Sequence, residues 1–236
     1  MSRINLFSPQ DIAAIGLLFF AWMAIGWLIE NPPQKSPSVS ILMEHYRREW
    51  MQVMVSRDPR IFDAPTPSTI RQGAAFFASA RMIAIGGALA LLGNAERLSG
   101  LANDLTLDTT PVFVWEVKLL TVTLFLANAF LKFVWSHRLF GYCAVLIAAV
   151  PNDSTDPVAK PRAEKAAEIN ITAARGFNRG LRSVYFSLGA TAWMLGPFAL
   201  IGATLITFFV LWRREFASRS RAVLMRPEDK PIDTQT

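Results

Sequence analysis

The residues of this chain that could do chemistry lie within or beside its apolar stretches. Arg81 falls inside the apolar run 72–93, and the run 112–136 carries Asn128 and Lys132. Ionisable and polar groups inside a membrane segment are costly, and they commonly line a path for ions, protons or substrates. Further basic residues follow along the chain. The candidate polar, anion-binding or lipid-binding site therefore comprises Arg81, Asn128, Lys132, His137, Arg138, Arg175, Arg179 and Arg182.

A polar seam runs along the predicted helix 112–136. On a wheel of 3.6 residues per turn, its members fall within about a quarter of the circumference; they are Lys118, Thr121, Asn128, Lys132 and Ser136. Arg81 and Asn128 each lie about nine residues from one end of their spans, so they reach a similar depth. We expect the seam to neutralise or solvate Arg81, with Asn128 as the nearest candidate acceptor.

Catalytic and metal-binding motifs are lacking in the sequence. It has no Gly-rich phosphate loop, no HExxH and no CxxC. Its single cysteine, Cys143, excludes an internal disulfide, and its two histidines, His45 and His137, have no metal-site spacing. We therefore predict no cofactor, no metal ligand and no catalytic residue. An enzyme that uses His45 or His137 as an acid or base is the least favoured hypothesis.

The composition is that of a multi-pass membrane protein. The chain is 52% hydrophobic and 18% charged, with a mean hydropathy of +0.30, whereas soluble domains carry about a quarter charged residues. The net charge is +6, but the basic residues lie mainly between apolar blocks, as in loops that face anionic lipid. We expect an integral protein of the bacterial inner (plasma) membrane and no nucleic-acid partner.

The apolar pattern predicts an all-α membrane protein, a bundle of about four transmembrane helices. The spans are expected at about 11–29, 72–93, 112–136 and 184–212. Amphipathic helices are expected in the first and third loops, at about 38–57 and 162–183. Residues 1–215 would form a single transmembrane domain, followed by a basic to polar tail, 216–236, that is partly disordered.

Two features of this plan leave alternatives open. Gly196-Pro197 should kink the last span, and the apolar piece 139–150 is too short for an ordinary span, so it is either a helix extension or a re-entrant segment. Lys and Arg concentrate in 31–71 and 137–182, which places both segments in the cytoplasm. An even number of spans would then leave the basic tail outside, against the same rule.

Three stretches resemble a known family. They are HYRREWM at 45–51, KFVWSHRLFGYCAVLIAAVP at 132–151 and AARGFNRGLRSVYFSLGATAWMLGP at 173–197. Together with the spacing of the apolar blocks, they are similar to the DUF599 family of uncharacterised membrane proteins. The resemblance implies a multi-pass membrane protein, and it brings no activity, cofactor or catalytic residue.

Two functions follow as hypotheses. The first is a non-catalytic integral membrane protein, structural or an accessory subunit of a membrane complex. The alternative is a transporter or channel for a small anion or an acidic lipid headgroup, in which the candidate residues form a cationic vestibule in the inner half of the membrane. The expected partners are anionic lipid headgroups and either a second copy of the chain or a larger membrane complex.

Overall fold

The computed structural model describes residues 6–63, 65–97, 99–100 and 111–227. These residues fold into helices, with no strand among them. The order comprises six long helices, a 3-10 helix, η2 (Ala192–Leu195), and a short helix, α8 (Arg219–Leu224). The long helices are α1 (Pro9–Glu30), α2 (Val39–Ser56), α3 (Pro65–Leu92), α5 (Val112–Ala148), α6 (Ala159–Thr191) and α7 (Pro197–Phe216).

The helices confirm the predicted fold class. Four of them are long and apolar enough to cross a membrane: α1, α3, α5 and the helix that begins at Pro197. α6 is not one of these four, although it is 33 residues long. The chain is therefore an all-α membrane protein with four apolar spans and one long helix of mixed polarity.

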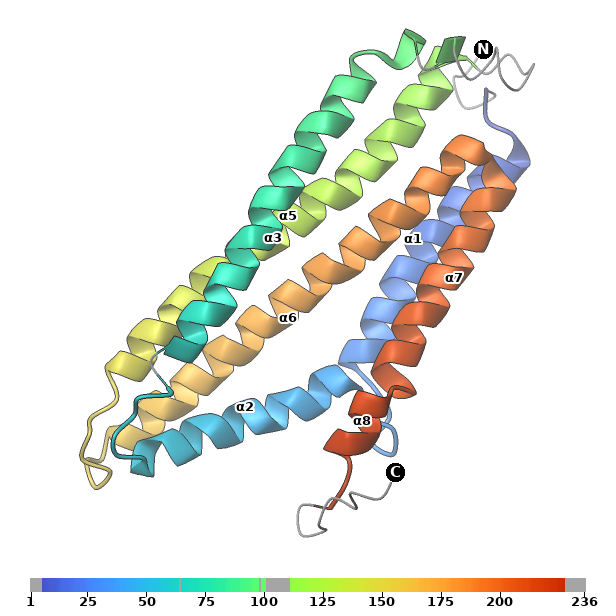
Figure 1. Cartoon of the computed structure of the whole chain (residues 1–236). Coiled ribbons are helices and arrows are strands. Elements are labelled where there is room, and N and C mark those ends of the chain that lie inside the picture. The colour runs from blue at the N-terminus through green and yellow to red at the C-terminus, as the bar shows by residue number, and fades with distance from the viewer. Residues whose placement is uncertain (1–5, 64, 98, 101–110, 228–236) are drawn as a thin grey trace, which may run out of the picture.

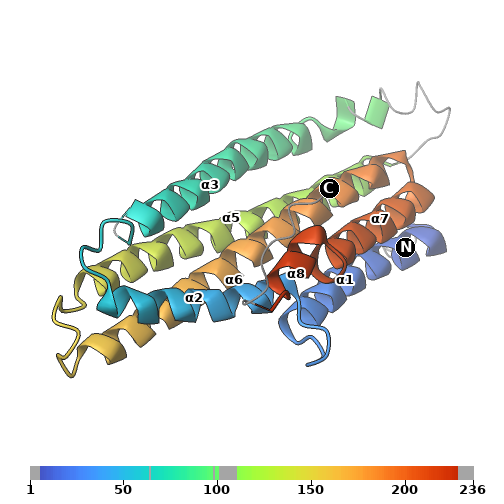
Figure 2. The same cartoon turned by 60° about the horizontal axis from the view of Figure 1, so that its bottom comes forward.

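The path of the chain places α6 at the centre (Figure 1). α1 descends, α2 crosses the lower end, α3 ascends, α5 descends, α6 ascends and α7 descends. α6 packs along α5 on one side and against α1, α2 and α7 on the other, whereas α3 packs mainly against α5. Seen from the second direction, α3 forms one outer edge of the molecule and α1 the opposite edge (Figure 2).

The predicted single kinked span at 184–212 is wrong. α6 ends at Thr191, and Gly196 has a φ of 114°, a left-handed conformation that glycine adopts without strain. Pro197 then begins α7, where its fixed φ suits the first helical turn. The chain thus reverses at Gly196-Pro197 instead of bending, and α7 returns antiparallel to α6 (Figure 1).

The short apolar piece 139–150 extends α5, which ends at Ala148. α5 is continuous over 37 residues, about 55 Å at 1.5 Å per residue, against a bilayer core of about 30 Å. The extra length packs with α2 and the first half of α6 in a small core that includes Met51, Met54, Cys143, Ile147, Ala163 and Ala166. The two predicted amphipathic segments correspond to α2 and to part of α6.

Part of the predicted tail is ordered. Ser218 caps α8, and Arg221 Nε donates to the carbonyl of Pro37 at 2.9 Å. α8 thereby lies against the start of α2 (Figure 2). Residues 228–236, the end of the predicted disordered tail, lie outside the described residues.

A face of small residues lets α6 approach α5 closely. Gly176 and Gly180 are both buried on α6, and a Cβ atom added at Gly180 would lie 2.9 Å from Cε1 of Phe133. Small residues four positions apart permit such approach between helices in a membrane. This close contact sets the position of α6 along α5, and with it the position of the arginines that α6 carries.

Candidate functional site

The polar seam of α5 faces α6. Asn128 Nδ2 donates to Ser183 Oγ at 2.7 Å, and Ser136 Oγ donates to the carbonyl of Ala173 at 2.7 Å. Both acceptors lie on α6, so these two members of the seam are satisfied by that helix, whereas Thr121 donates to the carbonyl of Val117 within α5. The helical wheel placed these residues on one face correctly, but it did not show which neighbour the face would meet.

The predicted contact between Arg81 and the polar seam is wrong. Asn128 is engaged by Ser183, and the buried Nε atom of Arg81 has no hydrogen-bond partner among the described residues. The Arg81 guanidinium carbon lies 6.0 Å from the ring centre of Phe77, on the same helix. The physical reason is that the polar groups of Asn128 and Ser136 are already taken up by α6, while α3 meets α5 and α6 there through aromatic side chains such as Phe77, Phe133 and Phe177.

His137 and Arg138 also lie away from the other candidate residues. His137 Nδ1 is 3.2 Å from the carbonyl oxygen of Arg71 on α3. Arg138 Nη2 donates to Tyr142 Oη at 2.9 Å, and its guanidinium carbon lies 5.7 Å from the ring centre of Trp135. His137 therefore contacts α3, whereas the contacts of Arg138 are with residues of α5 itself.

Four of the predicted site residues meet in one pocket. It lies between α1, α5 and α6, has a volume of about 320 Å³, and is called the inner pocket below. Five polar or charged residues line it, Asn128, Lys132, Arg179, Arg182 and Glu30, together with Trp22, Met23, Gly26 and Trp27. The structure thus groups half of the candidate residues with an acid and two indole rings.

Glu30 forms ion pairs with two arginines of α6. Arg179 donates from Nε to Oε1 at 2.9 Å and from Nη2 to Oε2 at 2.5 Å, and Arg182 Nη2 also donates to Oε1. The Arg182 side chain is only 8% exposed. Lys132 has no carboxylate within ion-pair distance in the described part of the chain. With three cations and one carboxylate, the inner pocket carries a net charge of +2.

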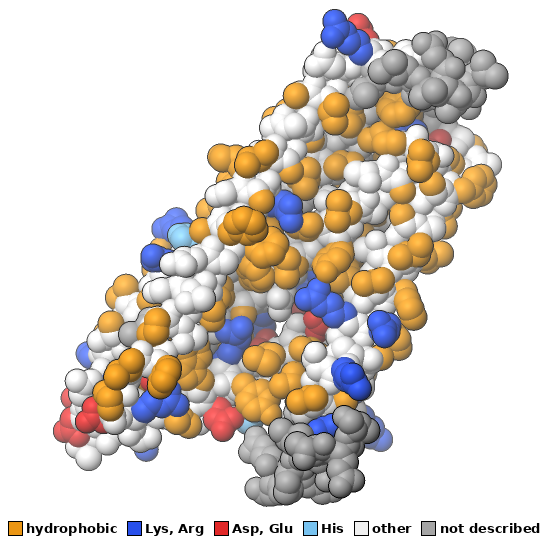
Figure 3. All heavy atoms as spheres, in the orientation of Figure 1, with side chains coloured by type: hydrophobic (Ala, Val, Ile, Leu, Met, Phe, Trp, Pro, Cys, Tyr) orange, Lys and Arg blue, Asp and Glu red, His pale blue; other side chains and the backbone are white. Residues whose placement is uncertain are grey.

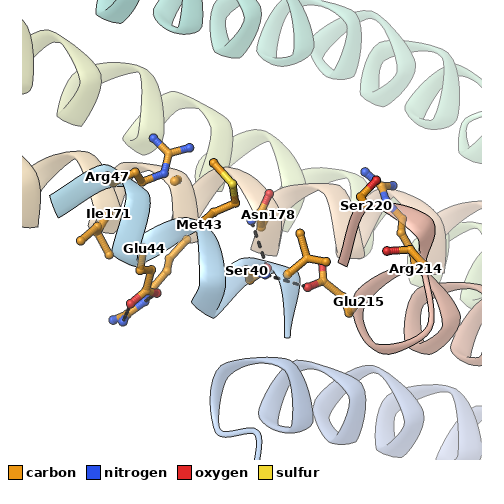
Figure 4. A pocket seen from close by; sticks show the side chains of 13 residues that line it. Ser40, Met43, Glu44, Arg47, Ile171, Asn178, Arg214, Glu215 and Ser220 are labelled. Atoms are coloured by element: carbon orange, nitrogen blue, oxygen red, sulfur yellow. Dashed lines mark hydrogen bonds and ion pairs between the residues drawn. The ribbon is translucent and has the colours of Figure 1, made fainter. Parts of the chain in front are cut away.

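Arg175 belongs to a second hollow, called the α2 pocket, between α2, α6 and the end of α7 (Figure 4). Arg175 pairs with both carboxylate oxygens of Glu44, through Nε at 2.6 Å and Nη2 at 2.7 Å. Glu215 Oε2 accepts from the backbone N–H of Ser40 at 3.0 Å. Burial lowers the pKa of the Arg47 guanidinium, which donates to Asn170. The charged side chains of this pocket each bind a group of the protein, and its three arginines and two glutamates leave a net charge of +1, smaller than that of the inner pocket.

The opposite end of α1 is also tied to its neighbours. Trp193 Nε1 donates to Asp11 Oδ1 at 2.7 Å. The buried Lys118 places Nζ at 5.1 Å from the ring centre of Trp115 and at 5.9 Å from that of Trp193. Asp11 and Glu30, the acidic residues at the two ends of α1, are thus each bound by groups that come from outside α1.

Comparison with known proteins identifies the family. A family model described as "Protein of unknown function, DUF599" matches residues 13–220, which is most of the chain. The chain belongs to the DUF599 family. No curated protein and no solved structure matches it.

The charges of this DUF599 protein are unevenly distributed. Lys, Arg, Asp and Glu side chains gather over the lower half of the face in Figure 3, while hydrophobic side chains dominate the upper half. Glu30, the last residue of α1, brings the inner pocket to the lower end of that helix. No group of three or more His, Cys, Asp or Glu residues suited to a metal occurs in the described chain.

Sequence reasoning missed Glu30, Trp22 and Trp27 as members of the site. Glu30 lies at the end of an apolar run, where a single acid is unremarkable, and its partners lie about 150 residues further along the chain. The tryptophans were visible at one end of the run, where indole rings favour the membrane interface. That signal indicates depth in the membrane, but it does not identify a pocket.

Proposed function

We propose that this membrane protein binds the acidic headgroup of an amphiphile in the inner pocket. The single observation that carries the proposal is the excess of cations there: Lys132, Arg179 and Arg182 face one carboxylate, Glu30. A net charge that is partly withdrawn from water is unfavourable until a counter-ion neutralises it. An anion supplied by a ligand would provide that charge.

The other wall of the pocket favours an amphiphile over a fully hydrated anion. Trp22, Met23 and Trp27 come from α1, and the Trp27 side chain is largely exposed. Indole rings prefer the boundary between headgroups and acyl chains. A lipid could therefore place its headgroup on the cations and its first methylenes against these rings.

The position of the inner pocket supports a ligand from the inner leaflet of the membrane. Glu30 ends α1 and is followed by a loop, 31–38, at the lower end of the molecule (Figure 1). The basic segments 31–71 and 137–182 are those that the distribution of Lys and Arg assigns to the cytoplasm. Anionic lipids attract such basic segments at the cytoplasmic surface.

The experiment is lipid retention by the full chain in phosphatidylcholine nanodiscs that contain a minor fraction of phosphatidylglycerol. Native mass spectrometry should show acidic lipid retained on the wild type and several-fold less on Lys132→Gln. Arg138→Gln is the matched control, since it removes the same charge from an exposed residue outside the pocket. Equal losses in the two variants would contradict the proposal.

The same variants separate binding from transport. Anion flux in proteoliposomes that falls in Lys132→Gln but not in Arg138→Gln would add a transport role to binding. A structural or accessory role in a membrane complex stays a prediction, and purification with stoichiometric partner subunits would support it.

A further inference from the structure

Glu30 occupies the place that a bound anion would take in the inner pocket. Resting on the proposed function, we propose that Glu30 determines the specificity of this site: it is an internal carboxylate that a phosphate monoester headgroup displaces. The pocket would then discriminate anions by charge as well as by shape.

The contacts of Glu30 describe the ligand that could replace it. Its two carboxylate oxygens accept three donors from Arg179 and Arg182. Arginine forks bind two oxygens on one centre, and they bind carboxylates and phosphates alike. A phosphate can present the same pair of oxygens and still offer a third to Lys132, which Glu30 leaves without an ion pair in the described chain.

Displacement of Glu30 is sterically reasonable. Its side chain is 23% exposed, whereas the Arg182 side chain is 8% exposed. Glu30 is also the last residue of α1, next to the loop that begins at Asn31. The carboxylate can therefore turn toward water while Arg182 stays in the pocket and retains the incoming anion.

The charge of the headgroup would decide whether the inner pocket prefers a phosphate monoester or a phosphodiester. A phosphate monoester carries about −1.5 to −2 near neutral pH, so once it has displaced Glu30 it opposes more of the +3 of Lys132, Arg179 and Arg182 than the single charge of Glu30 did. A phosphodiester carries a single negative charge, so it competes less well with the carboxylate of Glu30. The monoester should bind more tightly for as long as Glu30 is present.

The test compares lipids in nanodiscs of phosphatidylcholine that contain equal, minor fractions of phosphatidic acid, a monoester, and phosphatidylglycerol, a diester. Native mass spectrometry of the full-length wild type should show phosphatidic acid retained several-fold over phosphatidylglycerol. Glu30→Gln should retain more of both lipids, with the larger gain for phosphatidylglycerol, so that the ratio moves toward one. Inorganic phosphate added to the protein in detergent forms a second arm: stabilisation of the wild type by phosphate alone would identify the free anion, not the lipid, as the source of this chemistry.

The outcomes separate this inference from the proposed function. If Lys132→Gln loses acidic lipid but Glu30→Gln keeps the wild-type ratio, the site stands and the role of Glu30 is wrong. If Lys132→Gln behaves like Arg138→Gln, the site itself is wrong. Glu30→Asp covers the case in which Glu30→Gln fails to fold, because its shorter carboxylate keeps the charge but cannot reach both arginines equally. It should give an intermediate ratio, and an unchanged ratio would overturn the inference.

Discussion

A Cβ atom added at Gly189 would lie 3.2 Å from Oγ1 of Thr207, so the end of α6 lies directly against the middle of α7. Arg214 Nη1 donates to Tyr185 Oη at 2.9 Å, which pairs a residue earlier in α6 with one later in α7. The two helices are therefore antiparallel neighbours. Since α7 is apolar enough to cross a membrane, we expect the second half of α6 to cross the same layer in the opposite direction.

This helix path predicts five crossings, with the segment after Phe216 on the same side as the loop 149–158. The basic loops and the basic tail then share one side, as the positive-inside rule requires. Reporter fusions after Trp212 and within 151–160 should give the same cytoplasmic signal. Opposite signals from the two fusions would contradict this path, and a fusion in the Ala192–Leu195 turn should report the other side.

The close contact between α5 and α6 gives a stability prediction. Gly180→Ala should lower the free energy of unfolding by about 1 to 3 kcal/mol, because the new Cβ atom would overlap the buried Phe133 ring. Gly176→Ala is the matched control on the same helix, since its Cβ atom would lie 3.7 Å from that of Ser136, an ordinary contact. Thermal unfolding in detergent measures both, and equal transitions would refute the close approach.

Two ion pairs join α2 to α6, and they should contribute differently to the free energy of unfolding. Glu44 is 9% exposed in its pair with Arg175, whereas Arg48 and Glu168 are 45% and 60% exposed. Removing the partner of a buried carboxylate leaves that charge uncompensated, while an exposed pair contributes little. Arg175→Ala should therefore cost about 2 kcal/mol of unfolding free energy, and Arg48→Ala less than about 1 kcal/mol.

Thermal unfolding of the two arginine variants checks this difference. Both remove one arginine and one ion pair between the same helices, so differences in helix propensity and net charge cancel. A loss in Arg48→Ala as large as that in Arg175→Ala would show that burial of Glu44 does not decide the stability of this interface.

The apolar spans could be predicted from the sequence because each depends on its own composition. The crossing that we expect for α6 could not be predicted from hydropathy, because Asn170, Arg175 and Arg182 lower it. Their compensation by Arg47, Glu44 and Glu30 exists only after folding. Likewise, the helical wheel gives the polar face of α5 but not the helix that this face meets. For that reason the sequence predicted that Asn128 and Ser136 share a face of α5, but the predicted contact of that face with Arg81 was wrong.

The upper end of α1 provides the last prediction. Trp193→Phe should keep a buried aromatic ring but remove the N–H donor to Asp11, so this carboxylate would lose one of its hydrogen bonds. The expected cost is about 1 kcal/mol of unfolding free energy. Trp135→Phe is the control, since the Trp135 side chain is half exposed. If thermal unfolding shows the same transition for Trp193→Phe as for the control, the Asp11 contact does not stabilise the packing of α1 against the α6–α7 turn.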